Sequence, residues 1–249
     1  MNTIDVAACQ ELGIKKLVYV SSASAVYEGH DIENGDEKLP YSRISQAPYA
    51  DSKIAAEKEL LAANGKSGVA VCAIRPHVVF GPGDGRLVPQ LLSRAKTGWL
   101  KFSVGRSLGK LSDFTYVSNL IDALLAADER LAVNSPVGGQ AYFITNGEPL
   151  GFWDFVDDFL VQLGYTPVKY AVPYRVAYAA AGVAEAVDTL RGGSLGQEDG
   201  MTRFAIQYMC THHYFSVAKA KKELGYDPKV SVSQGITKTI AHLRATGQA

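Results

Sequence analysis

Lys16-Leu-Val-Tyr-Val-Ser21 decides the fold of this 249-residue chain, because a short run of β-branched and aromatic residues is typical of a buried parallel strand. Val69 to Ile74 is a second run of the same kind. Between them, Tyr49 to Ala63 carries Ala, Lys, Glu and Leu at helical spacing and ends at Asn64-Gly65. Two buried strands joined by such a helix predict a right-handed crossover and a parallel sheet.

The alternation of helices and strands extends in both directions from this unit. The patterns predict a helix over 3–12, a polar loop over 28–47, a helix over 87–96, a strand over 101–104, a segment at 113–117 that leads into a helix, a strand over 140–145 and a helix over 152–163. Such alternation predicts an α/β fold with a Rossmann-like, doubly wound parallel sheet. We expect this catalytic domain to occupy residues 1–150 and a smaller, mostly helical substrate-binding lobe to occupy residues 151–249.

The charge balance excludes partners that are held by charge alone. Lysine plus arginine total 25 and aspartate plus glutamate total 25, so the chain has no net positive charge that would attract nucleic acid.

Cys9, Cys72 and Cys210 lack the spacing of a zinc site or a disulfide scaffold, and we expect reduced, mostly buried thiols. The apolar run from Val176 to Ala184 has nine residues, whereas a membrane span needs roughly 20. With no signal peptide in the sequence, these features predict a cytoplasmic protein.

Pro48-Tyr-Ala-Asp-Ser-Lys53 carries the most informative pair of residues, because Tyr49 and Lys53 are four apart and share one helix face. A phenol has an ordinary pKa near 10, and an adjacent cation lowers it by favouring the phenolate. Such a tyrosine can serve as a general acid or base. Pairs with this spacing also arise by chance on amphipathic helices, so the pair alone does not establish a site.

The segment upstream of this helix strengthens the interpretation. Leu17-Val-Tyr-Val-Ser-Ser-Ala-Ser24 ends a predicted strand in small hydroxylated residues. Ligand-contacting groups of a doubly wound sheet lie at the carboxyl ends of its strands. Serine, tyrosine and lysine so placed are the parts of a hydride-transfer site, in which serine binds the substrate oxygen and tyrosine accepts its proton.

On these residues the sequence resembles the extended short-chain dehydrogenase/reductase family, in its 3β-hydroxysteroid dehydrogenase branch, and most nearly the sterol-4α-carboxylate 3-dehydrogenases (decarboxylating). The stretches that carry the resemblance are Leu17-Val-Tyr-Val-Ser-Ser-Ala-Ser-Ala-Val-Tyr-Glu-Gly29, Pro48-Tyr-Ala-Asp-Ser-Lys53, Ile74-Arg-Pro-His-Val-Val-Phe-Gly-Pro-Gly-Asp84, Asp113-Phe-Thr-Tyr-Val117, Ala141-Tyr-Phe-Ile-Thr-Asn-Gly-Glu-Pro149 and Lys219-Ala-Lys-Lys-Glu-Leu-Gly-Tyr-Asp-Pro228. They run nearly from end to end of the chain. Their common order and spacing are more specific than any one of them.

The resemblance implies roles for named residues. Tyr49 corresponds to the catalytic base, Lys53 to its partner, and Ser22 to the catalytic serine, with Ser21 as the alternative. Tyr49 and Lys53 are also expected to contact the cofactor, together with the backbone of the Pro76, His77 and Val78 turn. The implied cofactor is NAD, with NADP open, because the residue that selects between them lies outside the matching stretches. The side chain of His77 is left out of the catalytic set, because a histidine on such a loop is more often structural.

The sequence departs from the family pattern at the site for the cofactor pyrophosphate. Members of the family begin with a strand, a TGxxGxxG turn and a helix whose N-terminus receives the pyrophosphate. The glycine cluster Gly81-Pro-Gly-Asp-Gly85 lacks that spacing. We therefore expect the chain to be a fragment of a longer enzyme, without about the first two βαβ units.

The resemblance implies oxidation of the 3β-hydroxyl of a sterol or steroid, with loss of a 4α-carboxylate as a further step. A nucleotide-sugar epimerase of the same superfamily and a truncated, non-catalytic sterol-binding product are the alternatives. The segment Tyr170 to Val187, with Phe152, Trp153 and Phe155, is interpreted equally well as a pocket wall or as core. Peripheral membrane contact through the helix from Tyr174 to Val187 and a homodimer also stay open.

Overall fold

A parallel sheet of three strands lies at the centre of the computed structural model, which describes residues 2–45, 48–98, 100–192 and 202–248. β1 (Lys16–Val20) pairs with β3 (Ala70–Pro76), and β3 pairs with β8 (Ala141–Ile144), so the strand order is β1-β3-β8. The register places Val20 opposite Ile74. The two runs that decided the fold are therefore neighbouring parallel strands, as predicted.

The helices are α1 (Asn2–Glu11), α2 (Pro48–Ala62), α3 (Leu87–Lys96), α4 (Val117–Arg130), α5 (Phe152–Gln162), α6 (Tyr174–Leu190), α7 (Arg203–Met209), α8 (Ala218–Leu224) and α9 (Val232–Ala245). The helices up to α6 lie close to the positions that the sequence predicts, whereas α7, α8 and α9 fall in the region that was predicted only to be mostly helical. Pro48 is the first residue of α2, a position where its missing N–H costs no hydrogen bond. A capping box between Ser231 and Gln234 starts α9.

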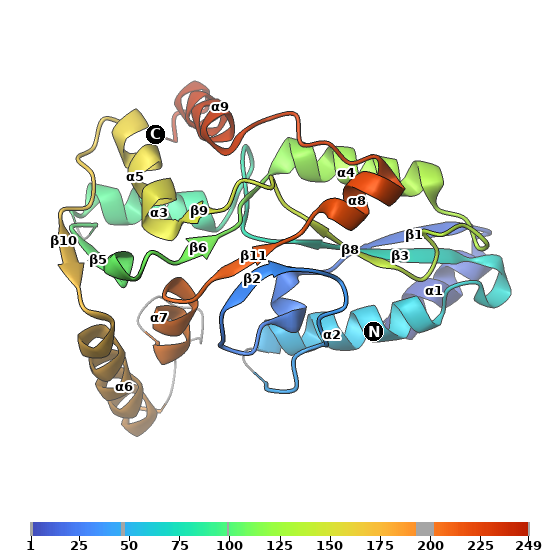
Figure 1. Ribbon diagram of the computed structural model, residues 1–249, viewed down its shortest axis with the longest axis horizontal. Helices are drawn as coiled ribbons and strands as arrows, with labels where there is room; N and C mark the ends of the chain where they lie inside the picture. Colours follow the sequence, from blue (N-terminus) through green and yellow to red (C-terminus); the bar gives the residue numbers. More distant parts are fainter. Residues whose placement is uncertain (1, 46–47, 99, 193–201, 249) are drawn as a thin grey trace.

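Helices cover both faces of the central sheet (Figure 1), with α4 and α8 on one face and α1 and α2 on the other. The alternation of side chains along a strand produces this arrangement. Ala70, Cys72 and Ile74 pack among residues of α4 and α8, whereas Val71 packs among residues of α1 and α2. The doubly wound architecture expected from the sequence is thereby confirmed.

Part of the segment 28–47, which the sequence predicts to be a polar loop, forms a strand of a second sheet. β2 (Ile32–Gly35) lies within that loop and pairs in parallel with β11 (His213–Phe215). The sheet has the strand order β2-β11-β6-β9, where β6 is Leu111–Ser112 and β9 is Leu150–Gly151. The polar sequence of β2 carries no strand signal, and its pairing partner lies far along the chain. Residues 46 and 47 of the expected loop lie outside the described residues.

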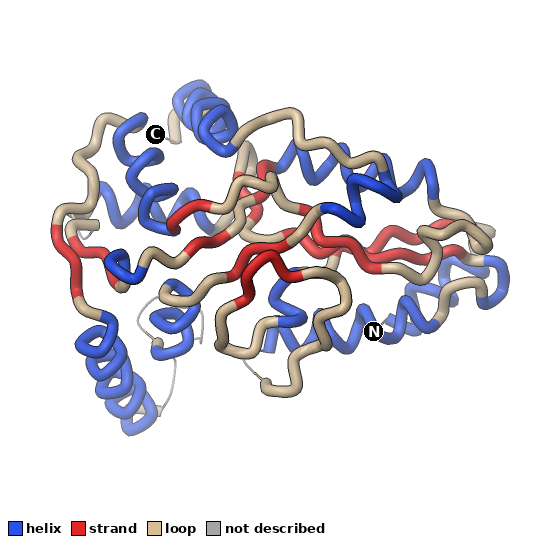
Figure 2. The backbone as a smooth tube through the Cα atoms, in the orientation of Figure 1, coloured by secondary structure: helices blue, strands red, loops and turns tan. Residues whose placement is uncertain are grey.

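The chain after residue 150 contributes to more than one part of the molecule. β10 (Tyr170–Val172) pairs in parallel with β5 (Phe102–Val104) and leads into α6, which packs against α7 at one end of the molecule (Figures 1 and 2). In contrast, α8 returns to the central sheet and packs near β8. The division into residues 1–150 and 151–249 stays a prediction.

Part of the region that was interpreted either as a pocket wall or as core is shown by its aromatic packing to be core. Phe155 is fully buried, stacks on Phe114 at a centroid distance of 4.0 Å and contacts Phe80 edge-on at 5.0 Å. It belongs to a core formed with residues of α3, α5 and α9. Phe152 and Trp153 are partly buried against the same core. For Phe155, the core interpretation is therefore correct.

α6 buries one face and exposes the other. Ala177 and Ala181 pack against Ile206 of α7, whereas Val176, Val183 and Leu190 are exposed. Within the described ranges, no helix combines the length and the apolar character that a membrane crossing requires. The three cysteines are buried and free, as expected.

Candidate active site

The Tyr49 and Lys53 side chains lie together at the carboxyl end of β1, as their spacing on α2 predicts. The Lys53 ammonium donates a hydrogen bond of 2.7 Å to the carbonyl oxygen of Val20, the last residue of β1. The same nitrogen lies 5.8 Å from the ring centroid of Tyr49 and 5.0 Å from that of Tyr19. Lys53 therefore joins the helix that carries the phenol to the strand end that carries the serines.

The Tyr49 phenol is accessible to a ligand. Its side chain is 46% exposed, and within the described part of the chain its hydroxyl has no hydrogen bond to Ser22 or Lys53. Partial burial lowers the pKa of Lys53, because an ammonium loses hydration on leaving water. A cation beside an open phenol is the arrangement that a general base requires.

The structure distinguishes the two serines at the end of β1. Ser21 is buried, and its hydroxyl has no hydrogen-bond partner among the described residues. Ser22 is only partly buried and caps the short 3-10 helix η1 (Ala23–Val26), accepting hydrogen bonds from the Ser24 amide at 3.2 Å and the Ser24 hydroxyl at 2.8 Å. Only a hydroxyl that reaches the surface can meet a substrate oxygen, so this geometry favours Ser22.

The Pro76, His77 and Val78 turn follows β3 beside the same sheet edge. His77 is buried, donates from Nδ1 to the Asp113 carbonyl at 2.8 Å and accepts at Nε2 from the Tyr208 hydroxyl at 2.9 Å. Burial, reinforced by the neighbouring His213, lowers the pKa of His77 to about 3. A neutral imidazole with both nitrogens engaged agrees with leaving the His77 side chain out of the catalytic set. Val78 has a φ of +36°, a strained conformation for a β-branched residue.

His77 belongs to a buried group of titratable residues that the sequence analysis did not single out. His213 stacks on His77 at 4.9 Å, and burial lowers its pKa to about 4. Asp113 is also buried, and burial raises the pKa of its carboxyl group to about 7. One Asp113 oxygen accepts from the Phe215 amide at 2.7 Å, and the other has no partner in the described part of the chain. These groups came together through packing between segments far apart in sequence.

A wide cavity of about 710 Å³ opens between the segment that follows η1 and the helices α6 and α7. Ile44 and Ser45 form one side, and Ser45 donates a hydrogen bond to Asp51 in the helix that carries Tyr49. Tyr178, Arg203 and Phe204 form the other side. The sequence analysis missed Arg203 and Phe204, because nothing local marks residues so far along the chain as lining one cavity with Ile44 and Ser45.

The nicotinamide and pyrophosphate ends of a dinucleotide differ in how well the described residues fit them. Tyr49 and Lys53 lie at the same sheet edge as the end of β3 and offer a hydroxyl and an ammonium, and the turn after β3 offers backbone groups. The N-terminus of α3, which follows Gly81-Pro-Gly-Asp-Gly85, is already filled: the Asp84 carboxylate accepts from the amides of Arg86, Leu87 and Val88 at 2.7, 3.0 and 3.1 Å. A phosphate would meet this carboxylate, so α3 does not replace the family's pyrophosphate turn.

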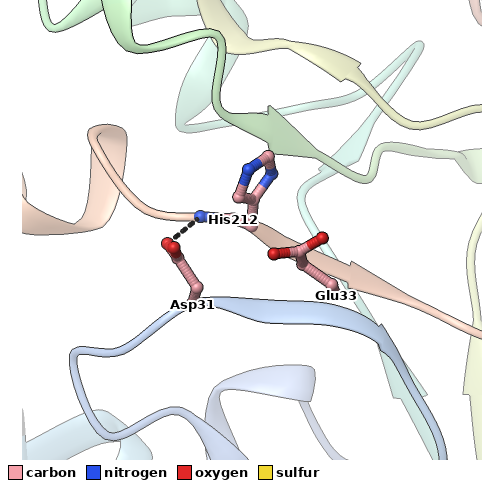
Figure 3. A group of neighbouring side chains, drawn as sticks. All are labelled: Asp31, Glu33 and His212. Atoms are coloured by element: carbon pink, nitrogen blue, oxygen red, sulfur yellow. Dashed lines mark hydrogen bonds between the residues drawn. The ribbon is translucent and has the colours of Figure 1, made fainter.

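Asp31, Glu33 and His212 form a group whose ligand atoms all lie within 4.8 Å of one another (Figure 3). The Asp31 oxygens are engaged, one with the His212 amide at 2.8 Å and one with the Lys110 ammonium at 2.6 Å. His212 Nδ1 accepts from the Leu111 amide at 3.1 Å, so the neutral imidazole carries its proton on Nε2 and offers no lone pair there. These bonds connect the segments at the starts of β2, β6 and β11, and the group supports no metal site.

Comparison with known proteins identifies close relatives of the chain. The sequence model of the 3-beta hydroxysteroid dehydrogenase/isomerase family matches residues 2–173. The chain is 38% identical over 243 residues to the mouse (Mus musculus) sterol-4-alpha-carboxylate 3-dehydrogenase, decarboxylating, covering 96% of this chain and 67% of that protein. It is 39% identical over 255 residues to the 3beta-hydroxysteroid-dehydrogenase/decarboxylase isoform 1 of Arabidopsis thaliana, covering 99% of this chain but 57% of the relative.

A bacterial relative carries a different name. The 2-alkyl-3-oxoalkanoate reductase of Stenotrophomonas maltophilia is 39% identical over 233 residues, which cover 93% of this chain and 69% of that protein. The chain thus spans between about half and two thirds of the length of these relatives.

Solved structures share the architecture. The structure of gox2253 has a TM-score of 0.75 and 26% identity, covering 97% of this chain and 70% of its own. A dTDP-glucose 4,6-dehydratase of Bacillus anthracis in complex with NAD has a TM-score of 0.67 at 18% identity, covering 99% of this chain and 67% of its own, a likeness that shows the fold alone.

Proposed function

Because the chain belongs to the 3-beta hydroxysteroid dehydrogenase/isomerase family, we propose that it carries the catalytic residues for NAD(P)-dependent oxidation of the 3β-hydroxyl of a sterol or steroid. The observation that carries the proposal is the position of Lys53, whose ammonium is bonded to the end of β1 and lies beside the open phenol of Tyr49. The fold alone would not suffice, because proteins with this architecture perform several reactions.

The three residues have different roles in the proposed reaction. Tyr49 takes the proton of the substrate hydroxyl as the alcohol becomes a ketone. Lys53 stabilises the phenolate through its charge and holds the ribose of the cofactor. The partly exposed hydroxyl of Ser22 donates a hydrogen bond to the substrate oxygen. General acid–base assistance of this kind accelerates a reaction by about 10²- to 10⁴-fold.

The nicotinamide cofactor, when bound, accepts the hydride from carbon 3 of the substrate. Lys53, Tyr49 and the backbone after β3 would hold its nicotinamide and ribose. NAD is the proposed cofactor, and NADP is the alternative.

A 4α-carboxylate on the substrate would add a second step without a further catalytic residue. Oxidation at carbon 3 converts such a compound into a β-keto acid. When carbon dioxide leaves, the electrons of the broken bond flow into the new carbonyl group. Hydrogen bonds from Ser22 and Tyr49 would stabilise the developing enolate oxygen.

A second candidate function is supported by the bacterial relative. The names of the mouse and Stenotrophomonas relatives both place the reacting carbon next to a carbon that carries a carboxylate. We therefore propose an acyclic 2-alkyl-3-hydroxyalkanoate, or the 3-oxo acid in the reverse direction, as the alternative substrate. Identity of 38% and 39% to the two relatives gives neither substrate an advantage.

Turnover and binding measurements on the 249-residue chain test these proposals. The chain is incubated with NAD or NADP and, in parallel, a 4α-carboxysterol, a 3β-hydroxysterol without the carboxylate, a 2-alkyl-3-hydroxyalkanoate and a UDP-sugar, and reduced cofactor and product are measured. Preference for either sterol supports the main proposal, and preference for the alkanoate supports the second. Epimerisation of the UDP-sugar in preference to both would overturn them. Calorimetric binding of sterol without any binding of nicotinamide cofactor would instead favour a non-catalytic sterol-binding protein.

A further inference from the structure

A buried ion pair lies on the same face of α2 as Tyr49 and Lys53. Glu57 is four residues beyond Lys53 and eight beyond Tyr49, so the three side chains follow one another along the helix over about 12 Å. Glu57 accepts from Arg75 Nε at 3.0 and 3.2 Å and from Nη2 at 2.5 Å. The two side chains are 0% and 4% exposed. This ion pair joins α2 to β3.

The ion pair and the Lys53 hydrogen bond attach α2 to adjacent strands at the same level of the sheet. Lys53 bonds to Val20 of β1, and Val20 lies opposite Ile74 of β3, the residue before Arg75. Two such attachments on one helix face restrict both the rotation of α2 about its axis and its translation along that axis. They determine where the first turn of the helix presents the Tyr49 phenol.

Tyr41 extends the ion pair to the segment that leads into α2. Its hydroxyl donates to Glu57 at 2.8 Å, and its ring lies 5.2 Å from the Arg75 guanidinium. The next residue, Ser42, donates its amide to the Ala25 carbonyl of η1 at 2.8 Å. The pair thus contacts, directly or through one residue, the helix of Tyr49, the segment after Ser22 and the strand that leads to Pro76.

Stability does not account for this pair. Two charges that leave water lose hydration, and their attraction often does no more than offset that loss. In addition, Arg75 Nη1 is buried without a partner in the described part of the chain. An apolar pair of the same volume would avoid both costs. What an apolar pair would not supply is the directional, bidentate geometry that sets one position of α2 relative to β3.

We propose that Glu57 and Arg75 are positioning residues that hold the Tyr49 and Lys53 face of α2 against the carboxyl ends of β1 and β3. The inference rests on the proposed function of Tyr49 and Lys53. Neither positioning residue touches the reacting atoms. Glu57 acts through the helix, and Arg75 acts through Glu57 and through the turn that follows it.

Competitive labelling of lysine amines tests the positioning role in the 249-residue chain without any need for turnover. The rate at which an acylating reagent modifies Lys53 is measured against pH by mass spectrometry. The variants are compared by the rate of the neutral amine, obtained from the pH profile, because the lowered pKa of Lys53 by itself speeds labelling. We expect the hydrogen bond to Val20 to keep this rate low in the wild-type chain. In Glu57→Gln we expect Lys53 to be labelled about tenfold faster, because losing a hydrogen bond to a charged group changes an equilibrium by about this factor.

Two further variants keep the test decisive. Tyr41→Phe removes one of the hydrogen bonds to Glu57 and is expected to change Lys53 labelling in the same direction by a smaller factor, even where Glu57→Gln does not fold. Asn119→Ala is the control: Asn119 bonds to Asn146 and to the segment at Val230, on the side of the sheet that α4 covers. It lowers stability without contacting the ion pair, so Lys53 labelling should stay at the wild-type rate.

The outcomes separate this inference from the proposed function. Faster labelling of Lys53 in Glu57→Gln and Tyr41→Phe, but not in Asn119→Ala, supports the positioning role whether or not the chain turns over a sterol. Wild-type labelling in both ion-pair variants overturns it. Equal acceleration in all three variants also overturns it, since general loosening of the fold would then explain the effect.

Discussion

The sheet region around α2 and the helical region around α6 hold their ion pairs in different ways. Glu57 and Arg75 are 0% and 4% exposed, whereas Glu185 of α6 and Arg203 of α7 are 27% and 52% exposed. Water and ions screen the second pair, and its residues line the wide cavity. The residues of the proposed chemistry thus share a helix with a fully buried ion pair, whereas the wall of the wide cavity contains a partly exposed one.

The largest expected difference between the two regions is in the kinetic effect of replacing one tyrosine in each. Tyr49→Phe removes the proposed base and should lower kcat by about 10²- to 10⁴-fold with little change in the free energy of unfolding. Tyr178→Phe, in the cavity wall, should change KM and leave kcat nearly intact. Steady-state kinetics with the substrate that the turnover experiment selects measure both. An unchanged kcat in Tyr49→Phe would show that Tyr49 is not the base, and the region around α2 would then not be the site of the chemistry.

The two ion pairs should differ in what each contributes to stability. Glu57→Gln leaves the buried Arg75 charge without its partner and should lower the free energy of unfolding by about 3–5 kcal/mol. Glu185→Gln, in the exposed pair, should produce a change too small to separate from experimental error. Urea titrations of the two variants beside the wild type provide the measurement. A similar loss in both would show that burial does not distinguish the pairs.

The buried titratable group next to the turn after β3 predicts the pH dependence of stability. His77 and His213 have pKa values of about 3 and about 4, below their ordinary 6.5, so between pH 4 and 6.5 the unfolded state binds more protons at these sites and stability falls on acidification. Asp113, with a pKa of about 7 against an ordinary 3.8, binds its proton more tightly in the folded state and opposes this loss. Near pH 5, in the wild type, these effects leave the unfolded state with about one more bound proton than the folded state.

Replacement of Asp113 tests this assignment. Asp113→Asn removes the opposing contribution, so near pH 5 stability should change by about 2.7 kcal/mol per pH unit instead of about 1.4. Urea titrations at several pH values give both slopes. Equal slopes in the two proteins would mean that Asp113 is charged throughout this range.

The smallest expected effect concerns the exposed face of α6, where peripheral membrane contact stays a prediction. Val183→Asp should weaken sedimentation with phosphatidylcholine vesicles about threefold, the value expected for the partial burial of one valine. Val161→Asp, at an exposed valine of α5, is the matched control. If neither substitution changes vesicle binding, the exposed face of α6 does not make the membrane contact.

The local sequence pattern was sufficient to predict those features of the structure that depend on a few neighbouring residues. The Tyr49 and Lys53 face follows from helical periodicity, and the carboxyl end of β1 follows from the run that ends at Ser21. The strand β2 was missed because its residues carry no apolar alternation. Glu57 was missed as well, since a charged residue on an amphipathic helix has the same appearance in sequence whether it faces water or a buried arginine.

The sequence by itself determined the alternation of helices with the strands of the central sheet, its doubly wound architecture and the shared face of Tyr49 and Lys53, because backbone periodicity acts over one or two turns. Only the tertiary structure decided that Ser22 reaches the surface while Ser21 is buried, that Arg75 pairs with Glu57, and that Arg203 faces the segment before Tyr49. Burial and ion pairing depend on which distant segments pack together. That information is distributed over the whole chain and is not carried by any single stretch of it.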